Sequence, residues 1–311
     1  MSEPRHPLLP YAAFIALALI WGISFLLIKV AVQDMSPPTL LLFRAASGCI
    51  ALAAIVFVIR RRLFNPGWRG YLFGFAFMAV TNAVIPWISI AWGEERISSG
   101  LASILNSTTT LWVAVLIYWV VPNERPSFVN YVGVVLGFAG VVVLVYPDIA
   151  QHGLSGDALG ALAVVVASLS YAVNSLYQRR RMRDLSVYEV SLGQLIFSTL
   201  FALPLAATSL PAMHVRPLSL AAVLALGAAG TGVAYLLYYY VMNTLGAVRA
   251  TGVTFVVPLT AVFWGVVLLN EKLSVPIVVG MVVILAGIVL TNLRRRRPRE
   301  VAAVRDSSAA A

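Results

Sequence analysis

The feature that most constrains this chain is a series of apolar stretches, each about 20 residues long. A helix of this length spans the roughly 30 Å hydrocarbon core of a bilayer. Short connections separate the stretches, and most contain Pro, Asn, Asp or clustered Arg, which favour turns. We therefore predict ten membrane spans, at approximately residues 8–32, 38–60, 69–92, 97–121, 127–146, 155–178, 187–208, 217–242, 247–269 and 273–293.

The composition supports the same class of protein. Hydrophobic residues make up 60% of the chain and charged residues only 11%, whereas soluble domains carry about 25% charged residues. The net charge of +10 could suggest a nucleic-acid partner. However, the basic residues lie at the ends of spans, where membrane topology explains them. The predicted fold is an all-α integral membrane protein with ten transmembrane helices, and no nucleic-acid partner is expected.

The placement of basic residues predicts the orientation. Ten spans put both termini on one side of the membrane, which then holds seventeen of the 22 Lys and Arg residues, while the other side holds four. Because cytoplasmic loops are enriched in Lys and Arg, both termini are predicted to be cytoplasmic. The four basic residues on the opposite side are Lys29, Arg96, Arg216 and Lys272, and Arg44 lies within a span.

The two halves of the chain repeat each other. Trp21 and Ser24 in the first span match Tyr171 and Asn174 in the sixth, at an offset of 150 residues. A second set, at an offset of 147, pairs Glu124 with Glu271, Gly133 with Gly280 and Gly140 with Gly287.

These matches predict two five-span units, residues 1–147 and 155–293, joined by a loop at 148–154. Because five is an odd number, the second unit enters the membrane from the opposite side. Inverted repeats of this kind are typical of secondary carriers, with a site at the repeat interface. The basic tail at 294–311 is expected to be disordered.

Several motifs together carry a family resemblance. They are the Trp-Gly-x-Ser stretch at Trp21, the spacing from Pro38 to Arg44, the Pro258 span, and twin Glu-x8-Gly-x6-Gly runs from Glu124 and Glu271. Because of these motifs, residues 10–293 resemble the drug/metabolite transporter superfamily, and within it the ten-helix EamA-type branch. The chain looks most like bacterial exporters of aromatic and other neutral amino acids.

The resemblance implies a carrier of the bacterial inner membrane that works by alternating access, without a cofactor. It also implies that aromatic residues at the centres of spans one and six line the pathway, and Trp21 and Tyr171 match those positions. Asn82 and Thr109 stand where larger aromatic residues are expected. Strict selectivity for aromatic substrates is therefore not implied.

Two pairs of side chains are the first candidates for substrate contact. Trp21 with Ser24, and Tyr171 with Asn174, each place a ring beside a hydrogen-bonding group on one helix face. The alternative is plain helix packing, because small and polar residues also hold membrane helices together.

Arg44 is the one basic residue expected inside a span. A guanidinium at this depth is costly and needs a partner. It can meet a substrate carboxylate, or it can lock the structure by binding backbone carbonyls. Its repeat counterpart is Gln194, so the charge has no symmetric partner.

Spans three, four and eight contribute further polar and aromatic candidates. Their hydroxyls can line a cavity or bond their own helix carbonyls, and some tyrosines can belong to an interfacial aromatic belt. The substrate-binding candidates from these spans are Asn82, Trp87, Asn106, Thr110, Tyr235 and Tyr239.

Spans five and ten are read as scaffold. Glu124 and Glu271 precede them and are expected to cap helices, and glycine faces permit close helix contact. A dimer interface is the alternative use of this face, so we expect a monomer or a weak homodimer. The glycines are Gly133, Gly140, Gly280 and Gly287.

Other functions fit less well. The three histidines form no metal-binding spacing, and no nucleophile motif is present, so neither a metal nor an enzyme activity is expected. A pump for cationic drugs would need an acidic residue deep in a span, and none is recognised in the sequence. Without such a carboxylate, proton coupling also has no obvious relay, so we expect facilitated, gradient-driven export. Export of another metabolite, such as a nucleobase, a sugar or a drug, and a polytopic membrane enzyme remain as alternatives. The expected partners are a small-molecule substrate and membrane lipid.

Overall fold

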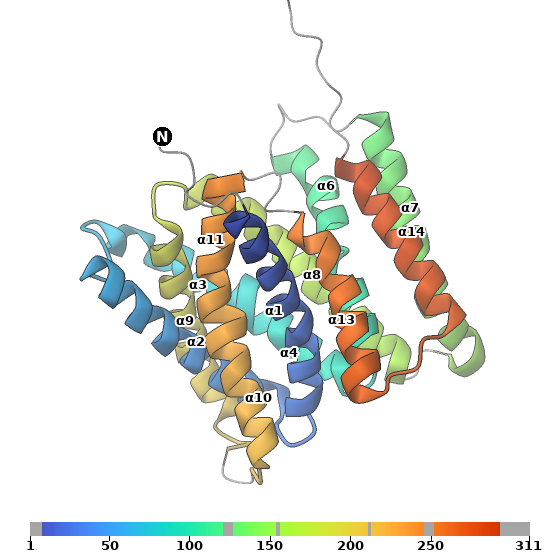
Figure 1. Ribbon diagram of the computed structural model, residues 1–311, viewed down its shortest axis with the longest axis horizontal. Helices are drawn as coiled ribbons and strands as arrows, with labels where there is room; N and C mark the ends of the chain where they lie inside the picture. Colours follow the sequence, from blue (N-terminus) through green and yellow to red (C-terminus); the bar gives the residue numbers. More distant parts are fainter. Residues whose placement is uncertain (1–7, 121–126, 154–155, 211–212, 246–251, 293–311) are drawn as a thin grey trace, which may run out of the picture.

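The computed structural model describes residues 8–120, 127–153, 156–210, 213–245 and 252–292. Within these ranges the chain is helical, and no strand occurs. Figure 1 shows the helices gathered side by side in one bundle. Glu124 and the tail at 294–311 lie outside the described residues.

Sixteen helical elements follow one another in the described ranges. The elements η2 and η3 are single π-helical turns, and η1 is a 3-10 turn. In chain order they are α1 (Leu9–Ala31), α2 (Pro37–Arg60), η1 (Trp68–Tyr71), α3 (Leu72–Ala79), η2 (Val80–Val84), α4 (Ile85–Glu94), α5 (Ser99–Asn106), α6 (Thr109–Val120), α7 (Phe128–His152), α8 (Gly156–Arg181), α9 (Val187–Ala206), α10 (Pro217–Gly227), η3 (Ala228–Val233), α11 (Ala234–Leu245), α13 (Val253–Leu269) and α14 (Val275–Asn292).

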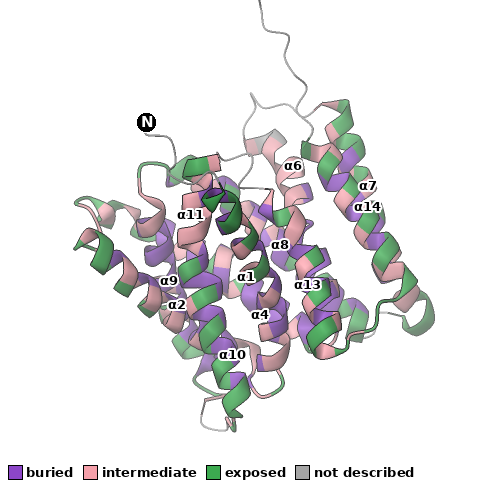
Figure 2. Ribbon diagram, viewed as in Figure 1, coloured by how far each residue is buried: buried purple, intermediate pink, exposed green. Residues whose placement is uncertain are grey.

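Nine stretches of the described chain are long and apolar enough to cross a membrane, and α13, at 17 residues, is apolar but shorter. Many of their exposed side chains are large and apolar. Exposed positions are green along the ribbons in Figure 2. The all-helical membrane class is therefore confirmed. The arrangement as ten spans in two inverted repeats stays a prediction.

The third and eighth predicted spans are each interrupted by a π turn. In the third, η2 precedes Pro86, whose ring nitrogen cannot donate the hydrogen bond that an α-helix requires. In the eighth, η3 contains Gly230 and Gly232, which weaken the regular helix, and Thr231 Oγ1 donates to Leu226 O at 3.4 Å. Such bulges occur frequently at functional sites.

The fourth predicted span is divided between α5 and α6. Ser107 Oγ donates to Ile104 O at 2.6 Å and Thr108 Oγ1 donates to Leu105 O at 2.6 Å. Hydroxyls bonded this way compete with the helix ladder and bend or end it. These side chains thus bond their own helix, which is the alternative to lining a cavity.

Helix pairing is reciprocal between the two predicted units. The first helix of the first unit, α1, packs on α10, α11 and α13, whereas α8 packs on α4, α5 and α6. The helices α2 and α9 pair with each other, as do α7 and α14. The α7–α14 pair stands at one side of the bundle in Figure 1.

Glycines bring α7 and α14 into backbone contact. A Cβ atom on Gly287 would lie 2.4 Å from Gly137 N and 2.6 Å from Gly133 O, and one on Gly140 would lie 3.0 Å from Gly280 O. Only glycine permits so close an approach. The four scaffold glycines therefore all lie at this one helix contact.

One ion pair ties the loop after α1 to the start of α10. Arg216 Nε donates to Asp34 Oδ2 at 2.9 Å, and Ser219 Oγ donates to the same oxygen at 2.5 Å. Hydrogen bonding to Arg216, and then to Ser219, lowers the pKa of Asp34 below its usual value of 3.8.

A lowered pKa means that Asp34 stabilises the fold above its unfolded-state pKa and loses this effect as the pH falls through the lowered value. We expect Asp34→Asn to lower the melting temperature by a constant amount above about pH 5, with the difference shrinking below about pH 4. Melting curves across this range measure it. A difference that grows toward acid pH would contradict the assignment.

Candidate functional site

The polar members of the two predicted pairs, Ser24 and Asn174, lie against the two π turns. Ser24, 6% exposed, lies against η3, because a Cβ on Gly230 would meet Ser24 Oγ at 2.9 Å. Asn174, 4% exposed, lies against η2 and accepts a hydrogen bond from Thr81 Oγ1 at 3.3 Å. The matched positions of α1 and α8 thus each meet the π turn of the opposite unit.

A polar group lies beside η2. Asn82 Nδ2 donates to Gln194 Oε1 at 3.1 Å, and Gln194 Nε2 donates to Tyr235 OH at 3.0 Å. Asn82 Nδ2 also lies 3.4 Å from Tyr235 OH. The three residues come from η2, α9 and α11, and we call them the amide–tyrosine group.

Arg44 is buried next to this group. Its guanidinium carbon lies 3.9 Å from the centre of the Trp87 ring, and Nε donates to Thr231 Oγ1 at 3.5 Å, the limit of a hydrogen bond. Within the described residues it has no ion pair and no other hydrogen bond. Tyr171, Tyr235 and Glu94 are the titratable groups in its surroundings. A buried guanidinium with unused donors is suited either to binding an anion or to locking neighbouring helices together.

Aromatic rings surround the polar centre. Trp21 lies 5.6 Å from Tyr238 between ring centres. Tyr171 packs against both main hydrophobic clusters, the first of which Trp21 also contacts and the second of which contains Trp87. Tyr238 is not among the residues predicted to contact substrate, and its place beside Trp21 is a finding of the structure.

Other candidates lie apart from this centre. Asn106 has a buried Oδ1 with no hydrogen-bond partner among the described residues, and Thr110 is half-buried. No contact of either with the amide–tyrosine group is found in the described chain. The side chain of Tyr239 lies outside the described residues.

Glu271 caps a helix, but not the one it precedes. Its Oε1 accepts from Ser99 N at 2.7 Å and its Oε2 from Gly100 N at 3.1 Å, at the start of α5. The acidic group offsets the free backbone donors and the helix dipole there. The local pattern predicted a cap on span ten, which is corrected by this long-range contact.

Glu94 is a buried acidic residue at the end of a span, so it does not contradict the expectation that no acidic residue lies deep within one. This last residue of α4 is 0% exposed. Neither carboxylate oxygen has a hydrogen-bond partner among the described residues. The sequence Glu94-Glu95-Arg96 reads as a charged loop, which concealed the burial.

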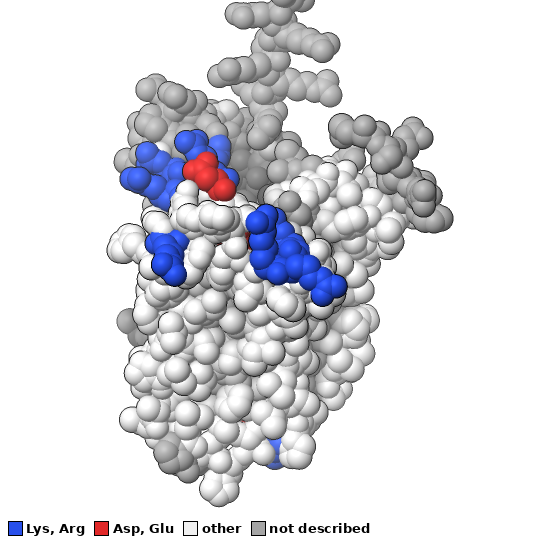
Figure 3. Space-filling model, turned by 90° about the vertical axis from the view of Figure 1, so that its left-hand side faces the viewer, with Lys and Arg blue, Asp and Glu red and all other residues white. Residues whose placement is uncertain are grey.

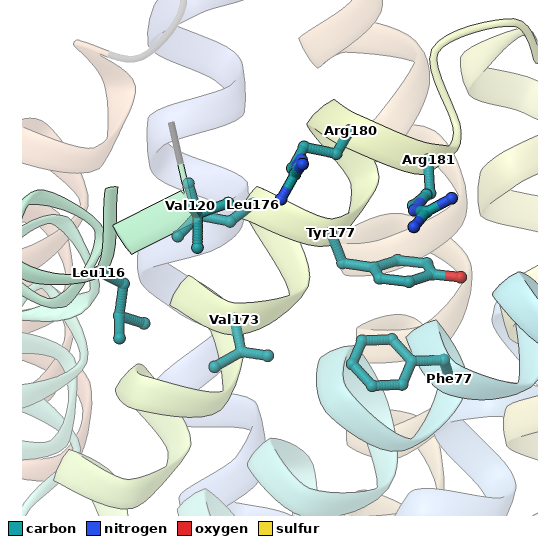
Figure 4. Close-up of a pocket in the computed structure, with 8 residues that line it drawn as sticks. All are labelled: Phe77, Leu116, Val120, Val173, Leu176, Tyr177, Arg180 and Arg181. Carbon is teal, nitrogen blue, oxygen red and sulfur yellow. The ribbon is translucent and has the colours of Figure 1, made fainter. Parts of the chain in front are cut away.

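A cavity of about 250 Å³ opens one turn away from the Thr81–Asn174 contact. Figure 4 shows Tyr177 beside Phe77 and two arginines above them. The two rings are tilted against each other, and their centres are 4.3 Å apart. Thr81 Oγ1 donates to Phe77 O at 2.9 Å, which joins the cavity wall to the polar centre. The cavity is lined by Phe77, Leu116, Val120, Val173, Leu176, Tyr177, Arg180 and Arg181.

Arg180 and Arg181, at the rim of the cavity, lie in the last turn of α8, which is rich in basic residues. Figure 3 shows Lys and Arg gathered near the upper end of one face, above a broad uncharged surface. Arg60, Arg69 and Arg181 lie in the last turns of α2, η1 and α8. Such a distribution is typical of a membrane protein with one cytoplasmic face.

The helical bundle and its buried polar centre define a multi-pass membrane protein of the transporter class. The EamA-like transporter family model matches the chain over residues 8–146 and again over 158–293. The chain therefore belongs to the EamA-like transporter family.

Its relatives are named as transporters. It is 23% identical to the uncharacterized transporter YoaV of Bacillus subtilis over 280 residues, covering 89% of this chain and 94% of that protein. It is 26% identical to the uncharacterized inner membrane transporter YedA of Escherichia coli over 294 residues, covering 92% of each. A solved crystal structure with 18% identity superposes with a TM-score of 0.64, covering 93% of this chain and 99% of that one, which supports the fold.

Proposed function

We propose that the protein is an inner-membrane secondary carrier that exports neutral amino acids, aromatic ones among them, by alternating access. The observation that carries the proposal is Arg44, a buried cation stacked on Trp87 with unused hydrogen-bond donors. A guanidinium in this state favours a carboxylate, which every free amino acid supplies.

The rest of the centre suits the remainder of such a substrate. Amide and phenol groups of Asn82, Gln194 and Tyr235 offer partners for an α-amino group. The rings of Trp21 and Tyr171 offer an apolar and cation-binding surface for the side chain. Broad contact of this kind favours a site that accepts several neutral side chains.

The alternating-access part of the proposal rests on the paired architecture. The family model matches the chain twice, and the pairing of α1 and α8 with elements of the opposite half is reciprocal. Two related units around one site can exchange conformations and so expose it to each side in turn. With both termini in the cytoplasm, the cavity at Arg180 and Arg181 is the cytoplasmic approach.

The alternatives differ in the group that Arg44 would recognise. A nucleobase or a neutral sugar has no carboxylate, so its transport would not depend on the guanidinium. A membrane enzyme would change the chemistry of its substrate rather than its location. Competition by amino acids lacking either the carboxyl or the amino group separates these cases.

The first test is the uptake of labelled tryptophan, threonine and methionine into liposomes that hold the purified protein. We expect uptake above that of protein-free liposomes, and a loss of tryptophan uptake of about tenfold or more in Trp21→Ala, since ring contacts contribute about 0.5–1.5 kcal/mol beyond the burial of their area. Uptake of none of the three by folded protein would reject the amino-acid assignment.

The cavity yields a separate prediction. Val173 lines it, so Val173→Trp is expected to fill the approach and slow transport at least about fivefold, because added bulk in a packed site is poorly tolerated. Val166→Trp, on the exposed face of the same helix at 52% exposure, is the matched control. Equal rates in the two variants would show that the cavity is not on the pathway.

A further inference from the structure

Glu94 is a buried acid that the proposed binding centre does not use. It ends α4, and its side chain is 0% exposed. Both carboxylate oxygens are buried without a hydrogen-bond partner in the described part of the chain. An ionised carboxylate in this condition is strongly unfavourable.

The nearest cation does not relieve this cost directly. Lys29 Nζ donates to the backbone carbonyl of Glu94 and to Ile97 O, the latter at 2.8 Å, so its hydrogen bonds serve the end of α4. Lysine near a helix C-terminus is favoured there by the helix dipole. The carboxyl group of Glu94 is left to be satisfied in another way.

The surroundings of Glu94 are otherwise tightly closed. Against α8, a Cβ on the preceding residue, Gly93, would lie 2.8 Å from Gly160 O and 2.8 Å from a methyl carbon of Val164, so the two helices are in close contact here. The stem of Arg96 packs at the same contact, with its Cβ 3.0 Å from the place of a Cβ on Gly160. On α5, the hydroxyls of Ser99 and Ser103 are 0% and 1% exposed and lack partners among the described residues.

The charged groups that act on Glu94 come from three other elements. They are Lys29 of α1, Arg44 of α2, and Glu271, which precedes α14. Glu271 is itself satisfied by the backbone of α5. The neighbouring Glu95 is exposed and pairs with Arg96 at 2.9 Å, outside the buried cluster.

We propose that Glu94 is a proton-binding site that controls whether one end of the bundle, at which α1 and α4 terminate, is open or closed to water. This end closes when the carboxyl group carries a proton, as a neutral acid can be buried here. It opens when the proton leaves to the aqueous compartment at that end, where water and Lys29 can meet the carboxylate. One proton is released on opening and one is taken up on closing.

This inference rests on the alternating-access part of the proposed function, and not on the substrate. It replaces the expectation of a carrier indifferent to protons with one whose return step depends on pH at this end. Carboxylic acids kept neutral by burial are well suited to such switches, because a small change in exposure changes their charge.

The test uses thiol accessibility and needs no substrate. Cys49, the one cysteine of the chain, is replaced by serine, and Ser99→Cys then places a near-isosteric thiol in the closed end. The full-length protein in detergent is labelled with a hydrophilic maleimide from pH 6 to pH 8. The reference protein carries Glu94→Gln in addition to these two substitutions. Both proteins contain the same thiol, so the effect of the thiol's own ionisation cancels when the labelling rate of one is divided by that of the other.

We expect the ratio of labelling rates, Glu94 protein over Glu94→Gln, to rise about tenfold or more across this range, since each pH unit changes the ratio of charged to neutral acid up to tenfold. Glu95→Gln should leave that rise intact. A flat ratio, or an equal loss of the rise in Glu95→Gln, would overturn the proposal.

A second variant covers the case in which Glu94→Gln does not fold. Removing the nearest cation with Lys29→Met favours the neutral acid, so labelling should begin to rise at a higher pH than in the parent. An unchanged pH dependence would overturn the proposal. Failure of amino-acid transport would leave both readouts untouched, so the two hypotheses fail separately.

Discussion

Arg44→Gln is expected to reduce amino-acid transport by about 10- to 150-fold, because hydrogen bonds to charged groups contribute about 1.5–3 kcal/mol. The substitution installs the residue found at the matched position of the second unit, Gln194. The loss should appear for all transported amino acids alike, since each presents the same carboxylate. Initial rates of uptake into liposomes, normalised to folded protein, measure the effect.

Two further variants make this result specific. Arg44→Lys keeps the charge but loses the planar stacking on Trp87, so it should recover only part of the transport rate. Arg60 also lies over an aromatic ring, at 5.3 Å from Tyr188, but at the far end of the same helix. Arg60→Gln should therefore transport normally.

The structural alternative for Arg44 predicts a different pattern. If the guanidinium only locks α2 to α4 and η3, Arg44→Gln should lower the melting temperature and the yield of folded protein, while the folded fraction still transports at the parental rate. That outcome would contradict the assignment of Arg44 to the substrate carboxylate.

The largest expected loss of stability is in Gly287→Leu, about 2–4 kcal/mol. The first added carbon would lie 2.4 Å from Gly137 N and 2.6 Å from Gly133 O, both backbone atoms. Neither can move without separating α7 from α14. In a membrane, where close packing rather than exclusion of water holds helices together, that separation is costly. Thermal unfolding in detergent measures the change.

Val289→Leu is the matched control for this variant. Val289 lies on α14 only two residues away, is 50% exposed and faces outward. The control should melt within about 0.5 kcal/mol of the parent, as surface substitutions usually do. If Gly287→Leu instead dissociated an oligomer without destabilising the chain, the α7–α14 face would be a dimer interface rather than internal scaffold.

The long apolar segments could be predicted because length and composition alone determine whether a helix can span a bilayer. The π turns could not, since the pattern of apolar residues gives no sign of a change from i+4 to i+5 hydrogen bonding. Pro86 was the one local signal for η2, and the pair Gly230 and Gly232 for η3. Both signals are weak, because membrane helices tolerate these residues.

In the candidate site, too, some residues could be predicted from the sequence and others could not. Trp21 and Tyr171 could be chosen because the two halves match there, and both rings pack against the main hydrophobic cluster. The positions of Glu94 and Glu271 could not be predicted. Each depends on packing between segments far apart in the chain, α4 against α1 and α8, and Glu271 against α5.

The most direct test of the account is a counterflow measurement. Liposomes containing the purified protein are loaded with unlabelled tryptophan and diluted into a trace of labelled tryptophan. An alternating-access carrier for amino acids predicts that labelled tryptophan will transiently accumulate above its equilibrium level, and that Arg44→Gln will suppress this overshoot. Labelled tryptophan that only equilibrates, or an equal overshoot in Arg44→Gln, would contradict the proposed carrier and its site.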